Sequence, residues 1–356
     1  RFMQNINWLN YLKLRTAYGS VGNDASAGWY SYWSLYGFGT MDGATNLVPS
    51  QLAGQNVKWE ATKTFDIALE GSILNDRLNF SVGYFNKRNS DLLFNVTRPL
   101  SSGNVDNNGI NPKVLMNVGT MQNIGWELAF GVDIIRNRDL KWNFNIDATF
   151  MKNKIIKLPD GKDMIGQALF QGKSIYEHYR TKWVGIDRLT GQSLYEMNPS
   201  SPDYIAYKDD NTPYFDEAKW QKDLADAERT GHLYEKDGVY YTDRPQYARR
   251  QILGSALPTV YGSFGTNLSW KGLNLSLLFT YSLGGKTYNS NYASLMNGIS
   301  SDSPQALHKD ILNSWTSAPA GITREINANG LPVPVIDPDG VPVINSDLQQ
   351  YNNYSS

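Results

Sequence analysis

The chain has 356 residues, with 33 basic and 34 acidic side chains, 10 Trp, 22 Tyr, 13 Phe and no Cys. The balanced charge gives no electrostatic basis for nucleic-acid binding, and without cysteine the chain has no disulfide, cysteine zinc site or thiol nucleophile. It contains no run of about 18 apolar residues, which excludes a membrane-spanning helix. The strands of a membrane β-barrel need only about 10 residues of alternating polarity, so this class stays open.

Seven stretches of the chain alternate between apolar and polar residues with the period of a β-strand. One set of alternate positions is apolar and carries no charge, as in Ile124, Trp126, Leu128 and Phe130; the other is polar, with Phe85 and Leu278 as exceptions. A soluble sandwich also alternates, but its strands usually run about 5–6 residues, and here the pattern lasts roughly 9–12. We therefore predict membrane-spanning strands near residues 10–21, 62–74, 77–88, 119–135, 139–152, 259–270 and 272–285.

The connections between these stretches alternate between very short and very long. Residues 75–77, 136–139 and 271–272 have the composition of tight turns. Much longer connections cover residues 19–62, 88–118, 152–257 and 285–356. Short turns at one rim and long loops at the other are typical of outer-membrane barrels, whose long loops are extracellular. We expect residues 152–257 to form a large extracellular loop region.

Tryptophans at both ends of the predicted strands fit the aromatic girdles of a membrane protein. Trp8, Trp142 and Trp270 lie beside the short turns, and Trp59 and Trp126 lie toward the long loops. The predicted fold class is thus all-β, an antiparallel transmembrane β-barrel segment with long extracellular loops. Bacterial single-chain barrels have an even number of strands, so seven strands do not close one. An open sheet edge in lipid would leave backbone groups unpaired. We therefore expect the chain to be part of a larger barrel, and an exported protein to begin before this N-terminus, where no secretory signal is visible.

Two groups of residues are candidates for substrate contact. The segment 28–38 contains six aromatics, of which Trp29, Tyr30, Tyr32, Trp33 and Tyr36 are the candidates; they either stack on sugar rings or hold one long loop against its neighbours. Polar positions of the alternating stretches are predicted to line a wet lumen, namely Asp66, Glu70, Glu127, Asp133, Asn145 and Asp147. Asp66 and Glu70, four residues apart on one face, also leave open a glycosidase pair.

Several other features favour structure over chemistry. Residues 215–228 and 304–315 are predicted to be short helices that stiffen the loops. The Gly172-Lys173-Ser174 sequence lacks the first glycine of a phosphate loop, and the stretches 187–191 and 337–340 are turns that lack a full calcium ligand set. The three histidines are far apart in sequence. We therefore predict no enzyme, no catalytic or metal-binding residue and no cofactor.

Several stretches resemble the barrel of SusC/RagA-type TonB-dependent transporters. They are residues 57–69, 75–78, 84–93, 117–128, 183–191 and 271–273, followed by Gly284-Gly285-Lys286. The resemblance covers most of residues 8–316 and implies a 22-stranded outer-membrane barrel with an N-terminal plug. By this resemblance we expect the chain to correspond to roughly the C-terminal third of such a transporter without its end, and therefore to lack the TonB box, the plug and the final barrel strands.

The resemblance also implies a function and partners. It suggests a nutrient importer in the bacterial outer membrane, energised by TonB through the missing N-terminal region and covered by a SusD-like surface lipoprotein. The expected cargo is an oligosaccharide, a preference that rests mainly on the aromatic cluster; a RagA-type peptide importer and a siderophore receptor are alternatives within the class. A secreted β-rich carbohydrate-binding module and a soluble glycosidase are the alternatives from other classes.

Overall fold

The computed structural model describes residues 6, 8–41, 43–97, 113–296 and 306–344. The chain divides into two compact units. The first comprises residues 1–175 and 257–285, and the second comprises residues 176–256 and 286–356. None of the described helices has the length and apolar character needed to cross a membrane.

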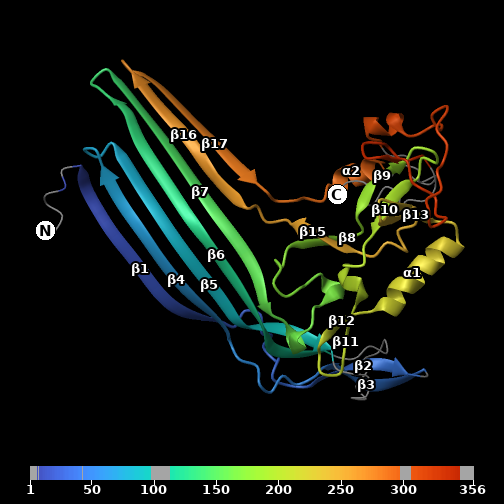
Figure 1. Ribbon diagram of the computed structural model, residues 1–356. Coiled ribbons are helices and arrows are strands. Elements are labelled where there is room, and N and C mark those ends of the chain that lie inside the picture. Colours follow the sequence, from blue (N-terminus) through green and yellow to red (C-terminus); the bar gives the residue numbers. More distant parts are fainter. Residues whose placement is uncertain (1–5, 7, 42, 98–112, 297–305, 345–356) are drawn as a thin grey trace. The chain divides into compact units, whose positions relative to one another are not determined.

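The first unit is built on one seven-stranded antiparallel sheet, in which the strands lie in the order of the chain (Figure 1). This arrangement confirms the predicted fold class of an all-β, antiparallel segment. The strands are β1 (Leu9–Asn23), β4 (Glu60–Ile73), β5 (Leu78–Thr97), β6 (Lys113–Arg136), β7 (Leu140–Lys157), β16 (Val260–Trp270) and β17 (Leu273–Leu283).

Tight turns join neighbouring strands at one end of this sheet. In the turn between β16 and β17, Lys271 and Gly272 both have positive φ angles, 45° and 93°. Two successive left-handed residues are what a type I′ hairpin turn requires, and glycine accepts this conformation without strain. Leu74, Asn75 and Asp76 are also left-handed in the turn between β4 and β5. The turns therefore fix the register of both hairpins.

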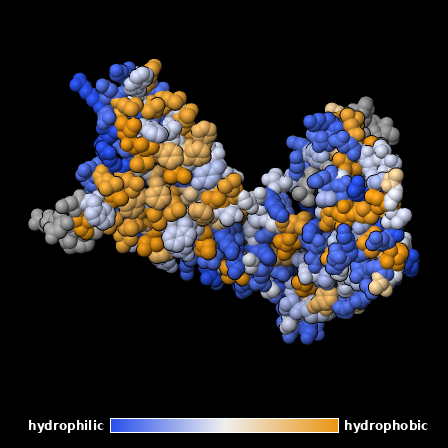
Figure 2. Space-filling view, turned by 45° about the horizontal axis from the view of Figure 1, so that its top comes forward, coloured by the Kyte–Doolittle hydropathy of each residue, from blue (hydrophilic) through white to orange (hydrophobic). Residues whose placement is uncertain are grey.

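The register separates polar and apolar side chains over the whole sheet. On one face, Leu14 lies opposite Leu69, and Leu69 lies opposite Val82. The row continues across β5 and β6 with Val82 opposite Leu128. We call this side of the sheet the apolar face and the other side the polar face. Hydrophobic residues gather in a band over this sheet in Figure 2.

The two apolar exceptions on the polar face cover glycines of the adjacent strands. Phe85 lies directly opposite Gly125, and its ring fills the space where a Cβ at Gly125 would lie, 2.5 Å from the Phe85 Cζ atom. Leu278 lies opposite Gly265 in the same way, with its Cδ1 atom 3.3 Å from that position. A large side chain over a cross-strand glycine protects a part of the sheet that would otherwise have no side chain.

Strands β5, β6 and β7 extend beyond the predicted limits at the end away from the turns. β5 continues to Thr97, β6 begins at Lys113 and β7 continues to Lys157. In these extensions polar and apolar residues mix at both sets of alternate positions, so the polarity pattern is lost although the backbone pairing continues. The loop between β1 and β4 contains a hairpin of β2 (Leu35–Met41) and β3 (Ala44–Gln51).

The second unit contains a five-stranded sheet in the order β13-β14-β10-β9-β18 and two smaller strand pairs. Thus most of the segment 152–257, predicted as a loop region, is folded together with residues from 286 onward. The five strands are β13 (Leu233–Lys236), β14 (Val239–Thr242), β10 (Ser193–Met197), β9 (Trp183–Asp187) and β18 (Ile336–Asp337). The strand pairs are β8 (Glu177–Arg180) with β15 (Gln251–Ser255), and β11 (Ile205–Tyr207) with β12 (Pro213–Phe215).

Helix α1 (Glu217–Arg229) agrees with the predicted helix at 215–228. Asp216 caps it by accepting a hydrogen bond from the Lys219 N–H at 3.1 Å. Trp220 on α1 packs edge-on against Tyr204, with ring centroids 5.2 Å apart. These two rings belong to the core of this unit, together with Tyr195, Met197, Ala227, Leu233 and Ala248.

The prediction of a second helix over residues 304–315 is wrong for the part that the structure describes. There the chain forms only a 3-10 helix at Lys309–Asn313, because the flanking residues His308 and Ser314 have non-helical ψ angles of 141° and 142°. Residues 304 and 305 lie outside the described residues. An α-helix that the sequence pattern did not reveal, α2, lies at Ser290–Met296. The remaining helical turns are short 3-10 helices at Pro159–Gly161, Ile165–Gln167 and Pro202–Tyr204.

Candidate ligand-binding surfaces

The six predicted lumen residues all lie on the polar face of the seven-stranded sheet. Glu70 lies opposite Lys13, with its carboxylate 3.6 Å from the Lys13 amine and 3.2 Å from Nε of Arg15. Asp66 lies on the same face, four residues from Glu70 along β4, opposite Ala17 and Phe85. Because Glu70 is engaged by two cations, the two carboxylates differ in environment, and no contact joins them into an acid–base pair in the described structure.

Polar side chains form hydrogen-bonded ladders across β6, β7 and β16. The Asn143 amide donates to Asp133 at 3.0 Å, and the Asn145 amide donates to Asn143 at 2.5 Å. Asp147 accepts from the backbone N–H and the hydroxyl of Ser263, at 2.8 Å and 2.5 Å. These bonds hold the amide and carboxylate groups in fixed positions, but each keeps further capacity for hydrogen bonds.

These ladders border a hollow of about 610 Å³ on the polar face. Among its lining residues are Asn79, Ser81, Asn145, Asp147, Asn267 and Ser276. The side chain of Glu127 is exposed on this face and makes no hydrogen bond or ion pair within the residues that the structure describes. A surface of amides, hydroxyls and carboxylates matches the donors and acceptors of a hydroxyl-rich or amide-rich ligand.

The five aromatic candidates of the β1–β4 loop are exposed. Trp29 is fully exposed, and Tyr30, Tyr32, Trp33 and Tyr36 are each about two-thirds exposed. The backbone beneath them is fixed, because the Gln51 amide donates to the carbonyl oxygens of Tyr30 and Trp33 at 2.8 Å and 3.1 Å. The aromatics therefore project from a supported loop, as a stacking platform requires, and they are not used to fill a local core.

A cationic pocket lies in the second unit. His178, Arg180, Lys182, Trp183, Lys286 and Tyr288 are among the residues that line it. The Arg180 guanidinium lies 4.1 Å from the centre of the Tyr288 ring, and the amine of Lys182 lies 2.5 Å from a Glu196 oxygen. Neither Arg180 nor Lys286 has a carboxylate partner within the described part of the chain. This pocket thus offers two uncompensated cations beside aromatic rings.

Sequence reasoning missed this pocket because its residues are distant in the chain. The backbone N–H of Lys286 donates to the carbonyl of Ser255 at 3.0 Å, and β15 pairs with β8, so residues near 180, 255 and 286 become neighbours. The sequence shows these cations only as separate charged residues, in Arg180-Thr181-Lys182 and in Gly285-Lys286.

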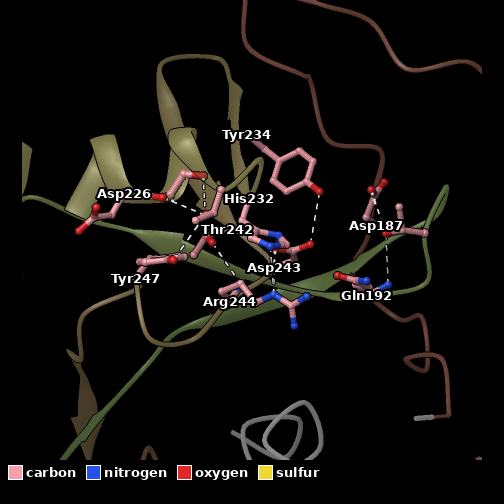
Figure 3. A network of polar contacts seen from close by, with 12 residues as sticks. Asp187, Gln192, Asp226, His232, Tyr234, Thr242, Asp243, Arg244 and Tyr247 are labelled. Atoms are coloured by element: carbon pink, nitrogen blue, oxygen red, sulfur yellow. Dashed lines mark hydrogen bonds and ion pairs between the residues drawn. The ribbon is translucent and has the colours of Figure 1, made fainter. Parts of the chain in front are cut away.

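A buried polar network stabilises the second unit (Figure 3). His232 Nδ1 lies 2.7 Å from a carboxylate oxygen of Asp243, and the Tyr234 hydroxyl donates to the other oxygen at 3.4 Å. Burial raises the pKa of Asp243, and burial together with the nearby Asp243 carboxylate raises the pKa of Tyr234 to about 12. The Asp243 carboxyl is almost completely buried, so we assign this network a structural role.

Charged residues of the turn-like stretches 187–191 and 337–340 form contacts within the second unit. Asp187 is fully buried; Thr190 donates to its carboxylate and Arg324 pairs with it, while Arg188 pairs with Asp337. The described residues hold no cluster of three or more potential metal ligands. Both turn-like segments therefore make structural contacts within the second unit.

A model of the TonB-dependent receptor-like β-barrel family matches residues 5–185 of the chain. The chain belongs to this family. A TonB-dependent receptor of Formosa agariphila is 30% identical over 297 residues, 81% of this chain. The TonB-dependent receptor SusC of Bacteroides thetaiotaomicron is 29% identical over 172 residues, which is 46% of this chain and 16% of SusC.

The fold is also shared with a solved structure. The RagAB peptide transporter structure matches 98% of this chain with a TM-score of 0.66, at 22% identity, over 34% of its own chain. Three Formosa agariphila receptors are matched over only 27–29% of their length. The chain therefore spans under a third of the curated relatives it matches. The predicted family is confirmed, and the β-barrel of this family accounts for the long antiparallel sheet.

Proposed function

We propose that this chain forms part of the wall of an outer-membrane nutrient importer of the SusC type. In this proposal the apolar face contacts lipid, the polar face lines the transport lumen and the long loops are extracellular. The importer moves oligosaccharides, is energised by TonB and is covered by a SusD-like surface lipoprotein. Transport is gated passage, so no residue of this chain needs to break or form a bond.

The length of the apolar face is the observation that supports this proposal most strongly. On β7 the outward positions are apolar from Leu140 to Phe150. Ten steps of about 3.4 Å give about 34 Å along the strand, or about 26 Å along the membrane normal at a tilt of about 40°. The lipid-facing band of outer-membrane barrels is about 25 Å tall. This match in height supports a membrane-embedded apolar band.

Exposure of the apolar face argues against the secreted carbohydrate-binding module. Leu14 is 65% exposed and Leu275 is 51% exposed, although both lie within the apolar band. A soluble protein would cover such a large surface with a second layer. Even Trp142 satisfies its indole N–H within the sheet, by donating to the Thr266 hydroxyl at 2.8 Å, as a lipid-facing tryptophan needs.

The aromatic loop gives a direct test of oligosaccharide as the cargo. We expect Trp29→Ala combined with Trp33→Ala to weaken binding of the transported oligosaccharide about 10-fold or more, because stacking on an exposed aromatic contributes about 0.5–1.5 kcal/mol per ring. Calorimetry on the detergent-purified full-length protein measures the change. Trp270→Ala, on the apolar face near the turns, is the matched control and leaves the affinity unchanged. Equal affinity of the loop variant and the wild type would contradict the assignment.

A peptide is the second candidate cargo, and the cationic pocket favours it. Arg180 and Lys286 lie unpaired beside Trp183 and Tyr288, an arrangement suited to a carboxylate that follows an apolar side chain. We expect Arg180→Gln with Lys286→Gln to reduce uptake of acidic peptides at least about 10-fold, since each charged hydrogen bond contributes about 1.5–3 kcal/mol. Lys208→Gln with Lys222→Gln removes two charges elsewhere in the same unit and serves as the control. Unchanged peptide uptake in the pocket variant would leave the oligosaccharide as cargo.

A further inference from the structure

A row of cations lies on the apolar face just beyond its aromatic border. Register places Lys63 directly opposite Arg88, Arg88 opposite Gln122, and Gln122 opposite Lys154. Lys152 lies one step nearer the band, opposite Ile124. We call Lys63, Arg88, Lys152 and Lys154 the cationic row. Toward the turns Phe65 and Ile124 follow on β4 and β6, and the Tyr84 and Trp126 rings lie beyond Asn86 in contact at a centroid distance of 5.2 Å.

The side chains of the cationic row point away from the polar face. All four are exposed, whereas Asn153 and Ile155, which alternate with Lys152 and Lys154, are buried. None of the four makes a hydrogen bond or ion pair within the described residues, in contrast to Lys13 and Arg15 on the polar face, which share Glu70. Register also brings no acidic residue into these rows. Glu60 and Asp66 lie three residues from Lys63, and Asp91 lies three residues from Arg88. The Glu60 carboxylate is occupied by the Asn23 amide and the Leu93 N–H, and Asp66 lies on the polar face.

The opposite end of the sheet lacks this arrangement. There the turns mix signs, with Asp76 beside Arg77 and Asp139 beside Arg138, and Arg136 lies 3.9 Å from Asp133. At that end carboxylates accompany the cations in sequence, whereas register brings no carboxylate into the rows of Lys63, Arg88, Lys152 and Lys154.

The height of the row fits the headgroup layer of a membrane. Four residues separate Arg88 from Tyr84, about 13 Å along the strand and about 10 Å along the membrane normal at a tilt of about 40°. Headgroups occupy about 5–8 Å beyond the hydrocarbon on each side, and long Lys and Arg stems extend toward them. Lys152, two residues beyond Phe150, reaches the inner edge of the same layer.

From this geometry we infer that the cationic row binds the phosphate groups of anionic lipid headgroups in the outer leaflet. This inference rests on the proposed membrane location and orientation. The row extends over four adjacent strands, from β4 to β7, or about 14 Å at about 4.8 Å per strand spacing, so it spans a headgroup that carries phosphate at more than one place or two neighbouring headgroups. Phosphate accepts hydrogen bonds from both Lys and Arg, and Arg binds it with two parallel bonds.

The test is the amount of phosphorylated lipid that stays with the full-length protein after detergent extraction from the outer membrane. The variant carries Lys63→Gln, Arg88→Gln, Lys152→Gln and Lys154→Gln. The matched control carries Lys13→Gln, Arg15→Gln, Lys87→Gln and Lys141→Gln, which also removes three Lys and one Arg but from the polar face. Native mass spectrometry counts bound lipid, and phosphorus analysis confirms that it carries phosphate.

We expect the row variant to retain at least about five-fold less phosphorylated lipid, since each cation near a membrane surface changes lipid affinity about five-fold. The control retains as much as the wild type. Adding excess inorganic phosphate does not release the lipid from the wild type; release would show that the row binds free phosphate and would overturn the assignment to lipid. Equal retention by the row variant and the wild type would also overturn it.

Two further results separate this inference from the proposed function. If the wild-type protein is absent from the outer-membrane fraction, the proposed function fails. If the wild-type protein is present in the outer membrane and the row variant retains as much lipid as the wild type, the inference fails while the proposed function stands. Should the quadruple variant not assemble, Arg88→Gln and Lys152→Gln singly, at exposed and unpaired side chains, each give about a five-fold weaker lipid affinity, and no change in either would again contradict the inference.

Discussion

Single residues show how the long sheet tolerates glycine without losing rigidity. Gly125 lies under the Phe85 ring and against the carbonyl oxygen of Phe150, so no Cβ fits there. Gly71 is covered by Phe80 and Gly119 by Phe94 in the same manner. The aromatic on one strand and the glycine on its neighbour therefore act as one unit.

Gly125→Ala is expected to destabilise the protein by about 1–3 kcal/mol, because its methyl group forces the Phe85 ring or the backbone to move. The measurement is the midpoint of urea unfolding of the purified protein in detergent. Gly19→Ala on β1 of the same sheet is the control, since nothing lies within 4 Å of a Cβ at Gly19. A midpoint for Gly125→Ala equal to that of the control would show that the Phe85 contact is not tight.

In the second unit, the residue with the largest expected effect is Arg249. Its guanidinium donates to both Asp223 oxygens, at 2.6 Å and 2.8 Å, and the Tyr204 hydroxyl donates to the same carboxylate at 3.0 Å. The Asp223 side chain is only 8% exposed, so its charge depends on these donors. Burial, followed by the Asp223 carboxylate, raises the pKa of Tyr204, so that this hydroxyl stays a donor.

Arg249→Ala leaves the buried Asp223 carboxylate without its cation and is expected to cost about 3–5 kcal/mol. Arg229→Ala removes an exposed partner of Asp226, 3.2 Å away, and is expected to change stability by less than about 1 kcal/mol. Hydrogen exchange of the α1 backbone amides compares the two variants. Similar exchange in both would mean that the Asp223 site is hydrated and not the anchor of α1.

At the scale of elements, adjacent residues on one strand face opposite environments. Leu128 on β6 lies opposite Val82 and Ala148 on the apolar face, and Ala129 lies opposite Ser81 and Asp147 on the polar face. The same substitution at the two positions therefore tests the orientation of the strand.

Leu128→Arg is expected to cost about 2–4 kcal/mol of folding stability in a bilayer, because it places a charge near the middle of the lipid band. Ala129→Arg is expected to cost less than about 1 kcal/mol, since it enters a hydrated surface beside Asp147. The measurement is folding of the full-length protein into lipid vesicles over a urea series. Equal costs, or a larger cost for Ala129→Arg, would reverse the assignment of the two faces.

The long strands were predictable because their two faces meet different environments, so apolar and polar residues alternate along the sequence. In β7, Leu140 to Phe150 alternate without interruption, so both the strand and its faces follow from the sequence. The extensions of β5, β6 and β7 were not predictable, since polar and apolar residues mix on both faces there while backbone pairing continues. The coverage of Gly125 by Phe85 explains why one apolar residue interrupts the polar face.

The second unit was largely hidden from sequence reasoning. Its strands have 2–5 residues, too few for periodicity to identify. α1 was visible because its apolar residues recur at helical spacing, but its packing against Tyr204 depends on a distant segment. Likewise Arg180 and Lys286 form one pocket only because β15 brings their segments together. The candidate site was thus predicted on the sheet, where register is regular, and missed where contacts are non-local.

On the scale of the whole molecule, family membership and the two-faced sheet lead to one proposal: a wall segment of an importer in the outer membrane. The apolar face and the polar face are the two sides of the same seven strands, and the cationic row lies on the apolar face at its long-loop end. The SusD-like lid and TonB are the partners expected for the complete transporter, and co-purification from detergent tests the first of them.

Because this chain contains no cysteine, the environment of each face of β6 can be measured with single introduced cysteines. Single cysteines are introduced at positions 126 to 131 of β6 in the full-length protein, with any other cysteine removed, and the cells are treated with a hydrophilic thiol reagent. We predict labelling at 127, 129 and 131, where the polar face meets water, and protection at 126, 128 and 130, where the apolar face meets lipid. Uniform labelling of all six positions, or the opposite alternation, would contradict a membrane-spanning strand with a hydrated lumen.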